Sequence, residues 1–69
     1  MDEESFVLAI DIAREKYDNV KFMVVLKDDT YIWFNDFVLA DEEHVLLETD
    51  EDCVVISYGE IKRLHFFSV

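Results

Sequence analysis

The chain has 69 residues, which we expect to form a single domain over 1–69, burying only about 60% of the surface of the unfolded chain. It is 52% hydrophobic, with six Phe, three Tyr and one Trp, which excludes an intrinsically disordered chain. Seventeen Asp and Glu against six Lys and Arg give a net charge of −11. Bare nucleic acid, which is bound through Lys and Arg, is therefore not an expected ligand, and the charge favours a protein with a basic surface.

The first predicted element is a helix over residues 2–19. Phe6, Ile10, Ala13 and Tyr17 recur at helical spacing and form an apolar stripe. Acidic residues occupy the first turn and basic residues the last, which complements the helix dipole. The helix is expected to bury this stripe against the remainder of the chain.

After residue 19 the apolar pattern changes to a period of two, which predicts β-strands separated by acidic turns. A bend is expected near Asn35 and Asp36. The five predicted strands cover 20–27, 30–40, 44–49, 53–58 and 61–67, with turns at 28–29, 41–43, 50–52 and 59–60. Short strands at this spacing predict a mostly β fold in which 20–67 form a five-stranded antiparallel barrel behind the N-terminal helix. The central strands are apolar on both faces, so one face must meet the helix or another chain.

The order of these segments resembles that of the Sm-like proteins, the family of small barrels that includes Hfq. The similarity rests on "VKFMVVLKDD" (20–29), "DEEHVLLE" (41–48) and "VVISYGEIKRLHF" (54–66). It implies an Sm-like or SH3-like five-stranded barrel capped by the helix. Hfq-type proteins grip RNA with a Tyr-Lys-His trio, of which this chain matches only Tyr58, followed by Gly59 and Glu60. RNA binding at this position is therefore not expected.

The chain also resembles the Rof-type proteins, which are small acidic inhibitors of the transcription terminator Rho. Similar segments occur in the same order at 17–29, 34–38 and 60–68. The resemblance implies a cellular or phage regulator that covers a basic, nucleic-acid-binding surface of a target protein. The alternative is a self-assembling Sm-like ring, acting as an RNA-binding or scaffold protein, in which the fourth predicted strand of one subunit pairs with the fifth of the next.

The candidate partner-binding residues come from two acidic turns and the second predicted strand. Alternate turns of an antiparallel barrel fall at the same end, so turns 28–29 and 50–52 are expected to form one negative patch. Trp and Tyr often anchor interfaces. The predicted site comprises Asp28, Asp29, Tyr31, Trp33, Asp50, Glu51 and Asp52. Two alternatives stay open: the acids only solvate turns and hinder edge-to-edge aggregation, and the aromatics pack under the helix.

No catalytic, cofactor or metal site is predicted. The chain contains no nucleophile elbow, P-loop or glycine-rich motif, so an enzyme is not expected. The cluster "DEEH" (41–44) lacks the spacing of a zinc or calcium site. The lone Cys53 is expected to be a small core residue. The acidic N-terminus is unlike a signal peptide and no apolar run reaches membrane-spanning length, so we expect a cytoplasmic protein, in the host cytoplasm if phage-encoded.

Overall fold

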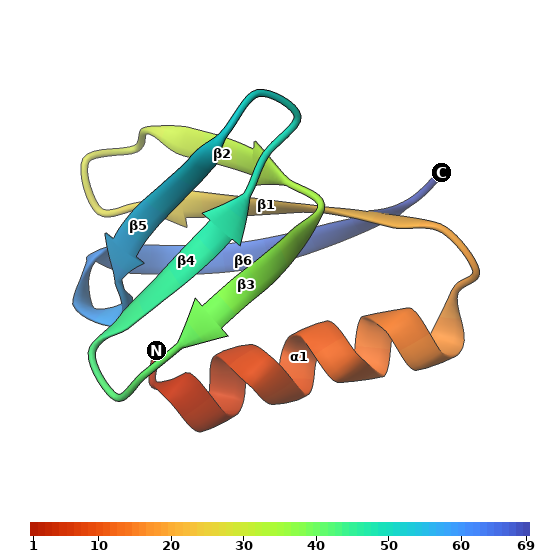
Figure 1. Cartoon of the computed structure of the whole chain (residues 1–69), viewed down its shortest axis with the longest axis horizontal. Coiled ribbons are helices and arrows are strands. Elements are labelled where there is room, and N and C mark those ends of the chain that lie inside the picture. The colour runs from red at the N-terminus through yellow and green to blue at the C-terminus, as the bar shows by residue number, and fades with distance from the viewer.

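The fold is seen in a computed structural model that describes residues 1–69 (Figure 1). One helix, α1 (Glu3–Lys16), precedes six strands. The strands are β1 (Val20–Leu26), β2 (Tyr31–Phe34), β3 (Asp36–Ala40), β4 (His44–Glu48), β5 (Cys53–Ser57) and β6 (Ile61–Ser68), and a 3₁₀ turn, η1 (Tyr58–Glu60), precedes β6. The predicted mostly β fold with an N-terminal helix is confirmed, with one strand more than predicted.

The helix begins where its sequence signals place it and ends earlier than predicted. The Asp2 carboxylate accepts a hydrogen bond from the Ser5 N–H at 2.8 Å, which satisfies one of the free donors of the first turn. At the other end Tyr17 is already extended, with φ −127°. Its ring packs against Phe66 of β6, 5.7 Å between centroids, and this contact takes Tyr17 away from the helical stripe.

The strands form two antiparallel sheets of three strands, ordered β2-β1-β6 and β3-β4-β5. The predicted strand 30–40 is divided at Asn35, whose N–H donates to the Glu48 carbonyl at 2.9 Å. Before Asn35 the chain pairs with β1, and after it with β4. The predicted five-stranded barrel over 20–67 is therefore wrong in this respect. The chain turns from one sheet into the other at the expected bend, and the two sheets do not close.

The core lies between the two sheets and the helix, which runs beside them in Figure 1. The Phe34 ring stacks on Phe22 and on Phe6, with centroids 5.2 and 6.1 Å away. The buried residues are Phe6, Ile10, Ala13, Phe22, Val24, Phe34, Val45, Leu47, Ile56, Tyr58 and Ile61. Burial of one such large side chain stabilises the fold by about 1.5–3 kcal/mol. The helix packs on this interior, and the outer faces of both sheets carry exposed large side chains.

Candidate protein-binding surfaces

The turn at 28–29 uses its carboxylates within the fold. The Asp28 carboxylate accepts the Thr30 N–H at 3.0 Å, and this hydrogen bond lowers the pKa of Asp28. Asp29 has a φ of 68°, the left-handed conformation that Asp and Asn tolerate in turns. Its carboxylate accepts from Lys62 Nζ at 2.8 Å, and that hydrogen bond, followed by the Lys62 charge, lowers the pKa of Asp29. Both predicted contact residues therefore have partners inside the molecule.

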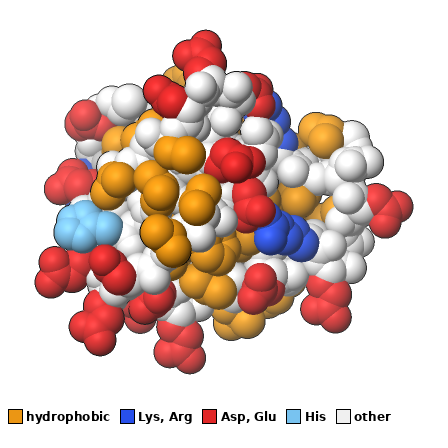
Figure 2. Space-filling model, viewed as in Figure 1, with side chains coloured by type: hydrophobic (Ala, Val, Ile, Leu, Met, Phe, Trp, Pro, Cys, Tyr) orange, Lys and Arg blue, Asp and Glu red, His pale blue; other side chains and the backbone are white.

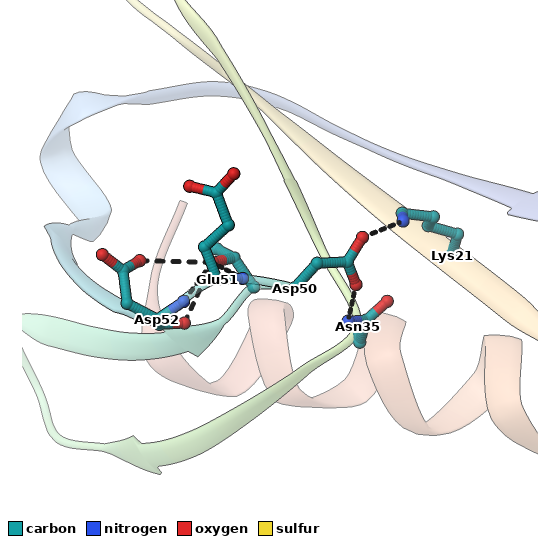
Figure 3. A network of polar contacts seen from close by, with 6 residues as sticks. Lys21, Asn35, Asp50, Glu51 and Asp52 are labelled. Atoms are coloured by element: carbon teal, nitrogen blue, oxygen red, sulfur yellow. Dashed lines mark hydrogen bonds and ion pairs between the residues drawn. The ribbon is translucent and has the colours of Figure 1, made fainter.

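The turn at 50–52 ties the two sheets together through Asp50 (Figure 3). The Asp50 carboxylate accepts from Asn35 Nδ2 at 2.7 Å and from Lys21 Nζ at 3.2 Å. The hydrogen bond from Asn35, then that from Lys21, lowers the pKa of Asp50. Asp50 therefore links the β4–β5 turn to the start of β1 and to the residue where β2 gives way to β3.

The other two acids of this turn point away from Lys21 and Asn35 in Figure 3. Thr49 organises this part of the turn, because its Oγ1 accepts the N–H groups of Glu51 at 3.3 Å and of Asp52 at 3.1 Å. The same hydroxyl lies 3.3 Å from the Asp52 carboxylate. No hydrogen bond or ion pair holds the Glu51 carboxylate, so Glu51 is available to a partner.

The two acidic turns lie apart, so the predicted common patch is wrong. Turn 28–29 contacts Lys62 beside the end of β1, whereas Asp50 contacts Lys21 beside its start. Lys21 and Leu26 are five residues apart on an extended strand, or roughly 17 Å. The turns lie apart because the β4–β5 turn belongs to the second sheet. The prediction assumed a single barrel, in which alternate turns fall at the same end.

Tyr31 and Trp33 lie on the outer face of the β2-β1-β6 sheet, 61% and 43% exposed. The Trp33 ring contacts Phe67 of β6, with centroids 5.3 Å apart. Trp33, Phe67, Asp50 and Lys21 border one shallow hollow. We call this surface, with Tyr31, Trp33 and Phe67, the aromatic face. The alternative that these aromatics pack under the helix is wrong, and the structure brings Trp33 together with Asp50.

The two sheets differ sharply in charge. All six Lys and Arg lie outside residues 36–57: Arg14, Lys16, Lys21, Lys27, Lys62 and Arg63. Residues 36–57 hold β3, β4, β5 and the turns between them, and we call them the acidic sheet. Their eight carboxylates belong to Asp36, Asp41, Glu42, Glu43, Glu48, Asp50, Glu51 and Asp52. Only Asp36, paired with Arg14, and Asp50, paired with Lys21, reach a Lys or Arg.

The outer face of the acidic sheet is apolar. Leu39, Leu46 and Val55 lie opposite one another across the three strands. Leu39 is 69% and Val55 61% exposed, and Leu46 is half-buried. These side chains line a shallow hollow with Asp41 and His44 at its margin. Figure 2 shows this apolar patch with acidic side chains around it. Sequence reasoning missed the patch, although strands apolar on both faces were the signal for it.

Two further expectations concern single residues. Cys53 is exposed at the start of β5, so its prediction as a core residue is wrong. Tyr58, the one match to the Hfq trio, is buried against Phe6, with ring centroids 5.8 Å apart. Burial, then the charges of Glu3 and Asp41, raises the pKa of the Tyr58 hydroxyl. Tyr58 acts here as a core residue.

Comparison with protein-family models, with characterised proteins and with solved structures finds no match. The structure contains no group of three or more His, Cys, Asp or Glu side chains placed to hold a metal ion. Its helix falls short of the length and apolar character needed to cross a membrane.

Proposed function

We propose that this protein is an acidic regulator that binds a basic surface of another protein and thereby inhibits it. The observation that carries the proposal is the acidic sheet, where eight carboxylates and no Lys or Arg accompany an exposed apolar row. Carboxylates of one sign speed the encounter with a basic partner and orient it. The apolar row of Leu39, Leu46 and Val55 supplies the surface whose burial stabilises the complex.

The contact residues in this proposal are four turn carboxylates without a Lys or Arg partner in the fold. Glu51 and Asp52 remain from the predicted set, and Glu42 and Glu43 join them from the β3–β4 turn. The aromatic face, with Tyr31 and Trp33, is a second anchor because exposed Tyr and Trp are frequent in binding hot spots. Asp28, Asp29 and Asp50 contribute charge while holding their own turns.

We further propose that the chain has an Sm-like fold. The order β6-β1-β2 continues through Asn35 into β3-β4-β5, which supports an open Sm-like arrangement whose bent second strand is split in two. If the protein acts as Rof-type inhibitors do, it has no enzymatic activity and occupies the surface of the target that would otherwise bind nucleic acid. The candidate targets are then a cytoplasmic nucleic-acid-binding factor such as Rho, or a host enzyme if the chain comes from a phage.

The test begins with capture of the target from lysate by the tagged protein, with and without nuclease. The purified target is then titrated with the parent, with a Glu42→Lys, Glu51→Lys variant, and with a Glu4→Lys, Glu15→Lys variant as control. Both variants change the net charge equally, but the control changes lie on the helix. We expect the first variant to bind roughly tenfold more weakly than the control. Equal affinities, or a complex that survives only with RNA present, would contradict the proposal.

A second candidate is self-assembly, favoured by the two outer strands β5 and β6, each paired on one edge only. β6 carries Lys62 and Arg63 and no acid, so it could complement the acidic sheet of another copy. A net charge of −11 on every copy opposes such assembly, and added salt should weaken that opposition. Light scattering distinguishes the two functions, because the inhibitor is expected to remain a monomer or dimer and the ring to have several times that mass.

A further inference from the structure

The outer edge of β5 offers unpaired backbone groups. The Tyr58 N–H donates to the Glu43 carbonyl, and the Thr49 N–H to the Asp52 carbonyl. In an antiparallel pair such hydrogen-bonded positions alternate with positions whose backbone groups point away from the partner. Counting along the β4–β5 register, the residues that point away are Cys53, Val55 and Ser57. None of the three takes part in a backbone hydrogen bond outside the regular elements.

The same edge borders the apolar patch. Val55 lies opposite Leu46, so its side chain belongs to the exposed row on the outer face. Cys53 and Ser57 flank Val55 on that face and are small. A strand added beside β5 would extend the sheet by one strand. Every second side chain of the added strand would lie on the same face of the sheet as Val55. The edge therefore combines hydrogen-bonding groups with apolar contact area.

Acidic turns lie at both ends of this edge. Turn 50–52 precedes β5, and turn 41–43 lies beside its end, where Glu43 bonds to Tyr58. No Lys or Arg lies within the acidic sheet. A second copy would supply the basic strand β6, but with a net charge of −11 that repels the first. A free, positively charged segment would have the same contacts without this repulsion.

We propose that β5 binds an extended segment of the partner protein as an added antiparallel or parallel strand, with apolar residues at alternate positions and Lys or Arg at its ends. The proposal rests on the proposed function, since it names the part of the basic partner that is bound. Backbone hydrogen bonds at Cys53, Val55 and Ser57 hold the segment, and Val55 selects its apolar side chains. The flanking carboxylates select its charge.

The probe is a synthetic peptide, Lys-Lys-Val-Thr-Val-Thr-Val-Lys-Lys, compared with the same peptide carrying N-methyl groups on all five central residues. The two share charge and side chains, but the second has no free N–H on either edge of its central segment and cannot donate to a strand ladder. We expect the full-length protein to bind the unmodified peptide about tenfold more tightly. The amide protons of Cys53, Val55 and Ser57 should become protected from hydrogen exchange on binding.

A Val55→Pro variant removes one outward-pointing donor without removing a hydrogen bond to β4. It should bind both peptides with the lower affinity, while Val55→Thr, which keeps the donor, should still distinguish them. Because the peptide comparison uses the parent protein, it stands even where the proline variant fails to fold.

The outcomes separate the two proposals. Equal, salt-sensitive binding of both peptides would overturn strand addition and leave the basic-partner function in place. If neither peptide binds even at low salt, strand addition is overturned, and the titration of the captured target alone decides the basic-partner function. If the three amides become protected only as the protein is concentrated, with a rise in mass by light scattering, a second copy occupies the edge and the inference is overturned.

Discussion

Replacement of Phe6 by Ala tests whether the helix is part of the core. Phe6 is fully buried, and its ring contacts Phe34, Phe37 and Tyr58 at centroid distances of 6.1, 5.9 and 5.8 Å. These three contacts reach β2, β3 and the turn before β6. One side chain of the helix therefore contacts elements of both sheets, and its removal should destabilise the whole fold.

The expected loss is large for a chain of this size. A buried Phe→Ala change costs about 3–5 kcal/mol, from lost transfer free energy and the cavity left behind. A domain of this length has a free energy of unfolding of roughly 3–10 kcal/mol. Phe6→Ala should therefore remove at least about a third of the stability, and all of it if the parent lies at the lower end of that range. It should also lower the thermal midpoint by 10 °C or more, on a scale of about 4–8 °C per kcal/mol.

The assay is urea unfolding followed by far-UV circular dichroism and by Trp33 fluorescence, which reports on β2. Leu8→Ala is the matched control, because Leu8 is 57% exposed on the same helix and should change stability by about 0.5 kcal/mol or less. If Phe6→Ala and Leu8→Ala unfold at the same urea concentration, the helix is not docked as described. Separate transitions for the two probes would refute a shared core equally well.

Three further results are expected. Trp33→Ala should weaken binding of the captured target less than the acidic-sheet double variant does, in the same titration; a larger effect would move the main contact to the aromatic face. Cys53 should react with a thiol reagent in the folded protein as fast as in urea, because it is exposed; slow reaction would place it in an interface. Hydrogen bonds lower the pKa of Asp41 and of Asp50 below the ordinary 3.8. The stability that these two carboxylates contribute is therefore fully present above pH 3.8, and it is lost as the pH falls through their lowered pKa values. Urea titrations between about pH 5 and pH 2 should show this loss, and a smaller one in Asp41→Asn.

The helix and the strand positions were predictable because each has a local cause. The spacing of Phe6, Ile10 and Ala13 requires a helix with one buried face, and all three are fully buried. Acidic turns separate apolar runs, so the strands lie within a few residues of their predicted bounds. The end of the helix was not predictable in this way, because Tyr17 leaves it for a contact with Phe66, far along the chain.

The division into two sheets depends on contacts that no local pattern reports. Asn35 bonds through its N–H to Glu48 and through its side chain to Asp50. A register shift between Phe37 and Leu39 then places Leu39 opposite Leu46. That shift decides which side chains of β3 face outward. The sequence shows that Leu39, Leu46 and Val55 are hydrophobic, but it does not show that they lie side by side on the outer face.

The candidate site was only partly predictable, because a count of charges does not say which carboxylates are already used. Asp29 and Asp50 were chosen for their place in acidic turns, yet each pairs with a lysine of the first sheet. The Asp50–Lys21 pair borders the aromatic face and offsets charge there. Glu51 came from the same reasoning and stays unpaired, whereas its turn neighbour Asp50 pairs with Lys21.

The result is a directional field rather than a uniformly acidic surface. The helix, the β2-β1-β6 sheet and the β1–β2 turn hold every Lys and Arg, while the acidic sheet holds eight carboxylates, six of them without a Lys or Arg partner. Under the proposed function, a basic partner is turned toward β3, β4 and β5 before contact, because the carboxylates without a Lys or Arg partner are concentrated there. The exposed apolar row and the open edge of β5 lie on that same side, so electrostatic orientation and short-range contact favour one docking position. This coincidence is the physical reason to propose the acidic sheet, rather than the aromatic face, as the binding surface.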